Sequence, residues 1–90
     1  MSITVRVPTQ LRPLTQGRSE VVAEGATVAA VIEDLERNHP GLRARLLDER
    51  GVRRFINLFV NDEDARHLGG LETPLRDGDS LTIVPAVAGG

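Results

Sequence analysis

Apolar and polar residues alternate at the start of the chain. The apolar positions are Ile3, Val5 and Val7. This two-residue period predicts a strand with one buried face. Pro8 ends the strand, because proline has no backbone N–H to donate to a neighbouring strand. Residues 9–17 contain a proline and a glycine and are typical of a hairpin loop, so a second strand is expected over residues 19–23.

A helical period follows from Thr27 onward. Its apolar residues recur at the spacing of one helix face, at Val28, Val31, Ile32 and Leu35. The hydroxyl of Thr27 can accept from an early helical N–H and so cap the helix. The run 38–41 (NHPG) stops it, because the residue before a proline is pushed out of helical geometry. Residues 42–47 predict a short helical turn, and residues 48–53 a polar loop.

The second half of the chain predicts a strand over residues 54–60, a turn over 61–64 and a short return strand over 65–67. A loop through Gly69-Gly70 then leads to a final strand over residues 80–84. Pro85 is expected to release the chain into a tail. We therefore divide the sequence into a folded domain (1–84) and an extended C-terminal tail (85–90).

This order of elements predicts an α+β fold of the β-grasp type. A helix between two hairpins must lie across one face of the sheet to bury its apolar stripe. The second hairpin then pairs beside the first, which places the first and last strands side by side in the middle. We expect a mixed sheet of four to five strands packed on one main helix, with a flexible Gly-Gly tail leaving the central strand.

Composition narrows the possible chemistry. Ninety residues form one small domain with little room for a deep substrate cavity, and the net charge of -2 argues against a nucleic-acid partner. There is no cysteine, so sulfur chemistry must use sulfur from another molecule. All basic residues are arginine, so no lysine can accept an isopeptide bond. No apolar run is long enough to span a bilayer and no signal segment is evident, so a cytoplasmic protein is expected.

The tail is the candidate chemical group. Gly89 and Gly90 can thread a narrow channel because they have no Cβ, and Ala86 and Ala88 keep the approach slim. Residues 85–90 extend over at most about 20 Å. A carboxylate must be activated before it can transfer a group, and this chain offers no nucleophile or phosphate-binding loop for that step. Activation is therefore expected in a partner enzyme; the alternative is that the two glycines are a frayed terminus.

The strand over residues 54–60 also predicts a partner surface. One face carries Ile56, Leu58 and Val60, and the other carries Phe55, Asn57 and Phe59. If the helix covers the first face, the second is open, and exposed aromatic side chains on a sheet often mark an association site. We assign Phe59, Asn57, Val84 and Leu68 to this predicted partner-binding surface. The alternative is that the faces are swapped and both phenylalanines are core.

Other polar groups predict no catalytic or metal site. We interpret His39 and His67 as solvated surface residues. The acidic turn 61–64 lacks the glycine and the distal glutamate of a calcium loop. Arg43, Arg45, Arg50, Arg53 and Arg54 are interpreted as a solvated face, with docking onto an acidic partner as the alternative.

The C-terminal run DGDSLTIVPAVAGG (residues 77–90) resembles the end of the ThiS/MoaD ubiquitin-like sulfur carriers. The pattern PTxLRPxTxG (residues 8–17) and the run VNDED (residues 60–64) are more specifically similar to the actinobacterial CysO branch. The resemblance implies that an E1-like adenylyltransferase of the MoeB/ThiF type activates Gly90 with ATP and magnesium. A sulfurtransferase then supplies the sulfur that turns Gly90 into a thiocarboxylate.

The same resemblance implies the later partners. In the CysO branch a PLP-dependent cysteine synthase uses the thiocarboxylate, and a zinc metalloprotease of the JAMM type releases the cysteine. The carrier itself would bind no cofactor, catalyse no reaction and be monomeric when free. Two alternatives stay open: sulfur donation in molybdopterin, thiazole or thiosugar pathways, and a protein modifier conjugated through Gly90.

Overall fold

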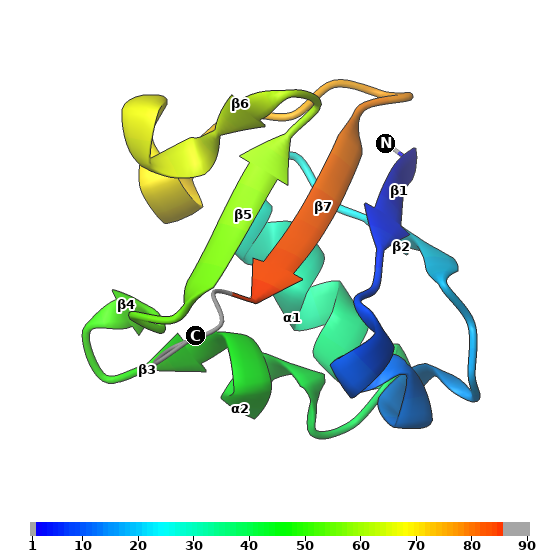
Figure 1. Ribbon diagram of the computed structural model, residues 1–90. Helices are drawn as coiled ribbons and strands as arrows, with labels where there is room; N and C mark the ends of the chain where they lie inside the picture. The colour runs from blue at the N-terminus through cyan, green and yellow to red at the C-terminus, as the bar shows by residue number, and fades with distance from the viewer. Residues whose placement is uncertain (1, 86–90) are drawn as a thin grey trace.

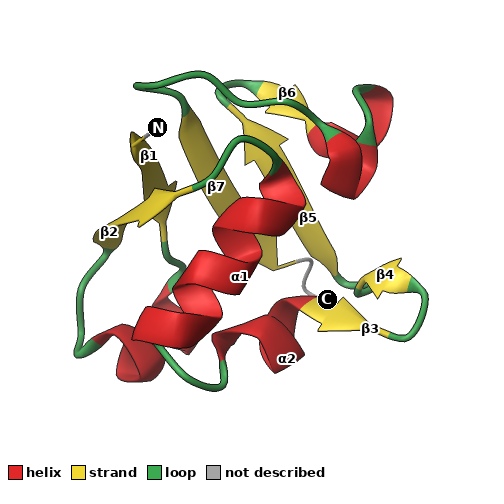
Figure 2. Ribbon diagram, turned by 180° about the vertical axis from the view of Figure 1, so that it is seen from behind, coloured by secondary structure: helices red, strands yellow, loops and turns green. Residues whose placement is uncertain are grey.

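The computed structural model describes residues 2–85, which form a five-stranded mixed sheet with one helix packed across it (Figure 1). The strand order is β2-β1-β7-β5-β6. These strands are β1 (Ser2–Arg6), β2 (Glu20–Glu24), β5 (Ile56–Val60), β6 (Glu63–Asp64) and β7 (Ser80–Pro85). Helix α1 (Val28–Asn38) crosses one face of the sheet (Figure 2), and no helix of residues 2–85 covers the central strands on the other face, which Figure 1 shows. The predicted β-grasp architecture is therefore confirmed.

The remaining elements are short and lie around the rim of the sheet. They are η1 (Thr9–Thr15), α2 (Leu42–Leu46), β3 (Leu47–Asp48), β4 (Gly51–Val52), η2 (Ala65–His67) and η3 (Gly70–Glu72). Strands β3 and β4 pair only with each other, as a separate two-stranded sheet. The predicted helical turn after α1 is confirmed as α2.

Alternation along β1 creates the first half of the core. Ile3 and Val5 are fully buried against α1, and β1 pairs antiparallel with β2 as the hairpin prediction required. The connection is a 3₁₀-helix, η1, rather than the loop expected over residues 9–17. Leu11 explains the difference, because its side chain is buried in the core and draws this segment onto the domain. Inside η1 the hydroxyl of Thr15 donates to backbone carbonyls and stabilises the turn.

The start and end of α1 follow from local chemistry. The hydroxyl of Thr27 accepts a hydrogen bond from the backbone N–H of Ala30 at 3.1 Å, as predicted. The four apolar residues of the predicted stripe are all buried. Gly41, just after Pro40, has a φ of 100°, a left-handed conformation that favours glycine and turns the chain into α2.

Strand β7 is the centre of the sheet. It pairs parallel with β1 and antiparallel with β5. Its residues Leu81 and Ile83 point into the core beside Leu58 and Val60 of β5. The prediction that the first and last strands lie side by side is thus confirmed. Strand β7 runs through Pro85, which lies opposite Ile56, one residue beyond the predicted end.

Two short predicted elements are wrong. The return strand is Glu63–Asp64, and residues 65–67 form the 3₁₀-helix η2. The cause is Asp64, whose carboxylate accepts the backbone N–H of Arg66 at 2.9 Å and so caps a helical turn. Residues 48–53 are likewise not a plain loop, because Leu47 pairs with Val52 to form the β3–β4 hairpin.

Gly25, in the connection from β2 to α1, provides a test of this packing. We expect Gly25→Ala to lower the free energy of unfolding by about 1–3 kcal/mol, because overpacking forces the backbone to shift. The added Cβ would lie 2.6 Å from the backbone nitrogen of Val31 and 2.9 Å from the carbonyl carbon of Ala30. Gly69→Ala is the matched control, since its Cβ would meet Thr73 at an ordinary 3.4 Å. Urea unfolding compares the two; a Gly25→Ala variant as stable as the wild type would contradict the close approach of α1.

Candidate functional site

The base of the tail lies at the end of β7, the central strand of the sheet. Strand β7 pairs with β1 over residues 80–82 and with β5 as far as Pro85, so the base of the tail is held to the body by the pairing of Pro85 with Ile56. The predicted tail residues Ala86, Val87, Ala88, Gly89 and Gly90 lie outside the described residues, and their roles stay predictions. Five residues separate Pro85 from the end of Gly90. An extended chain of that length reaches at most about 18 Å.

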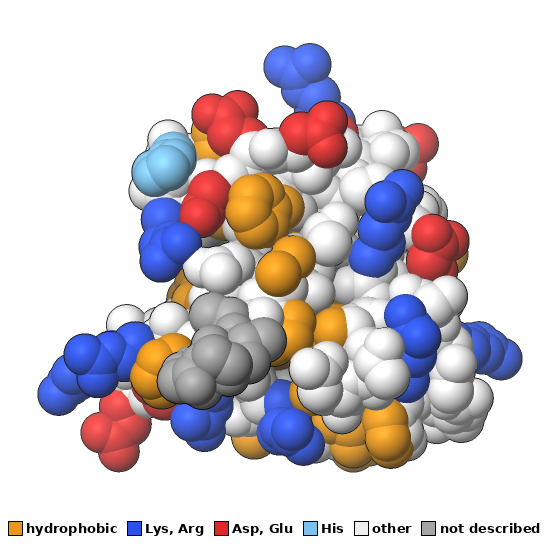
Figure 3. Space-filling model, viewed as in Figure 1, with side chains coloured by type: hydrophobic (Ala, Val, Ile, Leu, Met, Phe, Trp, Pro, Cys, Tyr) orange, Lys and Arg blue, Asp and Glu red, His pale blue; other side chains and the backbone are white. Residues whose placement is uncertain are grey.

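The face of the sheet opposite α1 carries the predicted partner surface. Figure 3 shows this face, with apolar side chains gathered over β5 and β7. Phe55 is 53% exposed, Leu68 44% and Val84 38%, whereas Phe59 is half-buried. The alternative with swapped faces is wrong, because Leu58 and Val60 are buried under α1.

Strand register brings three of the four predicted members of this surface together, namely Asn57, Phe59 and Val84. Asn57 lies opposite Val84, and Phe59 lies opposite Thr82, so Phe59 and Val84 are diagonal neighbours on the same face. Leu68 follows η2, which lies beside β5 (Figure 1), but it lines a groove at the other end of β5, with Val60 and Pro74, away from Val84. The arrangement places a small apolar surface directly above the strand that ends at Pro85.

Arg66 organises the edge of this surface, a role that the sequence did not predict. Its guanidinium binds both carboxylate oxygens of Asp64, at 2.8 and 3.2 Å, and donates to the side-chain oxygen of Asn57 at 2.7 Å. These bonds hold η2 against β5. They also use the side-chain oxygen of Asn57 as a hydrogen-bond acceptor. Asn57 therefore contributes to the surface mainly by its location on β5, and less by hydrogen bonding to a partner. The sequence pattern Asp64-x-Arg66 is compatible with such a pair, but nothing along the chain indicates the link to Asn57.

The electrostatics of this edge follow from the same contacts. Hydrogen bonds and charge attraction from Arg66 lower the pKa of Asp64 to about 2. The same pairing raises the pKa of Arg66 above its usual value. Both groups therefore stay charged throughout the physiological pH range, and the edge of the apolar surface is a fixed ion pair.

The two histidines differ in environment. His67 is exposed, as expected. The interpretation of His39 as a solvated residue is wrong, since it is buried at the end of α1. Its backbone N–H donates to the carbonyl of Leu35 at 2.6 Å and closes the last turn of the helix. The ring lies against the body because the chain reverses there at Pro40.

The internal Gly69-Gly70 pair lies in the segment predicted as a loop, where a turn at Gly69 leads into η3. The N–H of Gly69 donates to the hydroxyl of Thr73 at 3.0 Å, and that hydroxyl donates to the carbonyl of Gly70 at 2.7 Å.

Within residues 2–85 no group of three or more histidine, cysteine, aspartate or glutamate side chains is arranged to hold a metal ion. The helices in this range are too short or too polar to cross a membrane.

The similarity to known proteins extends along nearly the whole chain. The profile of the ThiS family matches residues 5–90. The sulfur carrier protein CysO of Mycobacterium tuberculosis is 54% identical over 93 aligned residues, which span 100% of both chains. A chain in the crystal structure of the Amycolatopsis orientalis BexX/CysO complex is 56% identical and superposes with a TM-score of 0.93, covering 98% of this chain and 99% of that one.

A third relative is described as a modifier. Small archaeal modifier protein 3 of Haloferax volcanii is 39% identical over 69 residues, which is 77% of this chain and 75% of that protein. The fold, the register of the central strands and the full-length sequence match lead to one assignment. The chain belongs to the ThiS family.

Proposed function

We propose that this chain is a sulfur carrier whose Gly90 carboxylate is adenylated by an E1-like enzyme and converted to a thiocarboxylate. The main support is the family match, which continues through Gly90, together with full-length similarity to a protein described as a sulfur carrier. The fold adds a physical reason: the residue at the base of the tail, Pro85, ends a central strand. A fixed base lets a short tail enter the active site of a docked partner without unfolding the body.

The proposed reaction divides between this chain and its partners. A carboxylate oxygen of Gly90 attacks the α-phosphate of ATP, pyrophosphate leaves, and an acyl-adenylate forms. A sulfide nucleophile then attacks the acyl carbon, the bond to AMP breaks, and the thiocarboxylate remains. The chain has no cysteine, so the sulfur comes from a sulfurtransferase or another donor, and ATP and magnesium are held by the adenylyltransferase of the MoeB/ThiF type. The chain itself acts as a co-substrate.

For the next acceptor we favour cysteine biosynthesis. The support is the similarity to CysO over the complete length of both chains. In this scheme a PLP-dependent cysteine synthase receives the sulfur, and a zinc metalloprotease of the JAMM type releases the product. The crystallised complex of CysO with BexX from Amycolatopsis orientalis supports the idea that a carrier of this kind docks onto a partner protein.

A second candidate function is protein modification through Gly90. It is favoured by the similarity to small archaeal modifier protein 3, which covers about three quarters of each chain. Both candidates begin with the same adenylation step. They differ in the nucleophile that removes AMP, which is sulfide for the carrier and a target amine for the modifier.

Mass spectrometry distinguishes these candidates. We expect incubation with an adenylyltransferase of this type, ATP, magnesium and a sulfide source to raise the intact mass by one oxygen-to-sulfur exchange. Deletion of Gly90 should abolish the change and leave the fold intact, because the tail lies beyond the sheet. Gly69→Ala, in the internal Gly-Gly pair, should react like the wild type. A Gly90 deletion that still gains sulfur would contradict the mechanism, and adducts to other proteins without a thiocarboxylate would favour the modifier.

The apolar surface on the open face provides a further prediction. We expect Val84→Ala to weaken binding of the adenylyltransferase about three- to tenfold, because two buried methyl groups contribute roughly 1 kcal/mol at an interface. Val22→Ala is the matched control: Val22 lies on the same face but on the edge strand β2, and is 66% exposed. Phe59→Ala should reduce the free energy of binding to the adenylyltransferase by more than it reduces the free energy of unfolding. Calorimetry measures the affinity of each variant for the adenylyltransferase. Equal affinities for the Val84 and Val22 variants would show that the enzyme binds another part of the protein surface.

A further inference from the structure

A groove at the base of the tail is lined by arginines. Pro85 shares this groove, of about 460 Å³, with Phe55 and with the three arginines Arg45, Arg53 and Arg54, which we call the arginine collar. Arg45 comes from α2, and the other two come from the link between β4 and β5. Segments distant in sequence therefore bring positive charge to the place where the tail leaves the sheet.

The collar residues are positioned but not neutralised. The guanidinium Nε of Arg53 donates to the carbonyl of Ala44 at 2.8 Å, and Arg54 lies 6.0 Å from the centre of the Phe55 ring. Neither Arg45 nor Arg54 forms an ion pair or a side-chain hydrogen bond with another residue of the 2–85 segment. Arg43, on the same helix as Arg45, differs in this respect, because it pairs with Glu33 at 2.9 Å.

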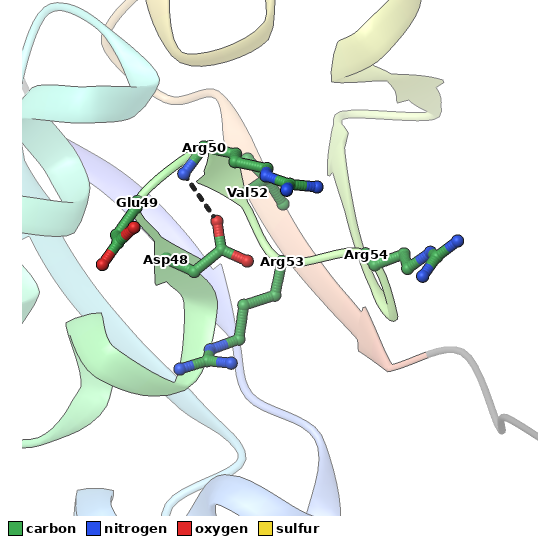
Figure 4. Close-up of a pocket in the computed structure, with 6 residues that line it drawn as sticks. All are labelled: Asp48, Glu49, Arg50, Val52, Arg53 and Arg54. Atoms are coloured by element: carbon green, nitrogen blue, oxygen red, sulfur yellow. Dashed lines mark hydrogen bonds between the residues drawn. The ribbon is translucent and has the colours of Figure 1, made fainter.

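The neighbouring carboxylates leave an excess of positive charge. Asp48 also lines the groove, and its side chain accepts the backbone N–H of Arg50 at 2.8 Å. In Figure 4 the side chains of Arg53 and Arg54 leave the chain in different directions, with Arg54 turned away from Asp48. Acidic side chains instead concentrate along the upper edge of the open face, and basic side chains predominate over its lower half (Figure 3). A chain with a net charge of -2 thus has a basic end where its tail begins.

The length of the tail determines what must contact the collar. The five residues after Pro85 reach at most about 18 Å, so a protein that holds Gly90 deep inside an active site must bring its entrance close to Pro85. Contact there removes water from Arg45 and Arg54. An arginine that loses water without gaining a carboxylate destabilises a complex strongly, whereas a paired one supports fast and specific docking.

We propose that the arginine collar docks onto acidic side chains that surround the entrance of the tail-accepting site on the partner protein. This inference rests on the proposed function, since it assumes that the tail enters a partner. It adds the chemical character of the entrance, and it separates two contributions on this chain. The apolar surface around Phe59 and Val84 supplies area, and the collar supplies charge and orientation at the base of the tail.

Charge reversal tests this proposal, with BexX of Amycolatopsis orientalis as the binding partner. We expect Arg45→Glu and Arg54→Glu each to weaken BexX binding by about tenfold at low ionic strength, mainly through slower association. The wild-type affinity should fall as salt is raised, because screening shortens the Debye length from about 30 Å at 0.01 M to about 3 Å at 1 M. Arg76→Glu is the matched control: it changes the net charge equally, but it lies before the opposite end of β7.

The outcomes separate the inference from the proposed function. Circular dichroism verifies that the Arg45→Glu, Arg54→Glu and Arg76→Glu variants are folded. Wild-type-like binding of Arg45→Glu and Arg54→Glu, an equal loss for Arg76→Glu, or no binding of the wild type would overturn the collar proposal. Competition by a short single-stranded RNA would instead assign the collar to nucleic acid. The mass-spectrometric assay detects sulfur at Gly90 independently of docking. A chain that gains sulfur at Gly90 but binds BexX equally well after Arg45→Glu or Arg54→Glu therefore contradicts only this inference.

Discussion

The parallel pairing of the first and last strands is the constraint on which the rest of the structure depends. Three residues of β1 align with three of β7, beginning at the Thr4–Ser80 pair. The contact continues before the start of β7, where the N–H of Gly78 donates to the carbonyl of Ser2 at 2.9 Å and the N–H of Ser2 donates to the Asp77 carboxylate at 2.7 Å. Parallel neighbours require a long crossover. The intervening chain supplies it, and α1 within that chain covers the shared face.

This constraint also explains the arrangement of the candidate site. Because β7 is central, β5 lies beside it and presents Phe59 next to Val84 on the open face. The segment that enters β5 carries Arg53 and Arg54 to the end where β7 stops. The base of the tail is therefore surrounded by an apolar surface on one side and a basic groove on another. This geometry is compatible with the division that we propose, in which this chain supplies the body and the tail and a partner supplies the reaction chemistry.

Much of the fold could be predicted from local pattern alone. The Thr27 cap, the apolar stripe of α1 and the alternation along β5 depend on residues close in sequence, and all were confirmed. Predictions failed where distant or side-chain contacts decide the backbone. Asp64 caps η2 in place of a return strand, and burial of Leu11 and His39 against the core depends on packing that no local period encodes. The sequence indicated the collar arginines as a basic run, either solvated or docked onto an acidic partner, but not their proximity to Pro85, which arises from tertiary structure.

The central claim is that the fixed body presents a Gly90 carboxylate for conversion to a thiocarboxylate. The most direct test is the intact mass of the protein isolated from the cells that encode it, without thiol reagents, with fragmentation to locate any change. The account predicts a population in which Gly90 is heavier by one oxygen-to-sulfur exchange. A carrier recovered only with an unmodified Gly90 carboxylate, under growth conditions that demand sulfur transfer, would contradict it.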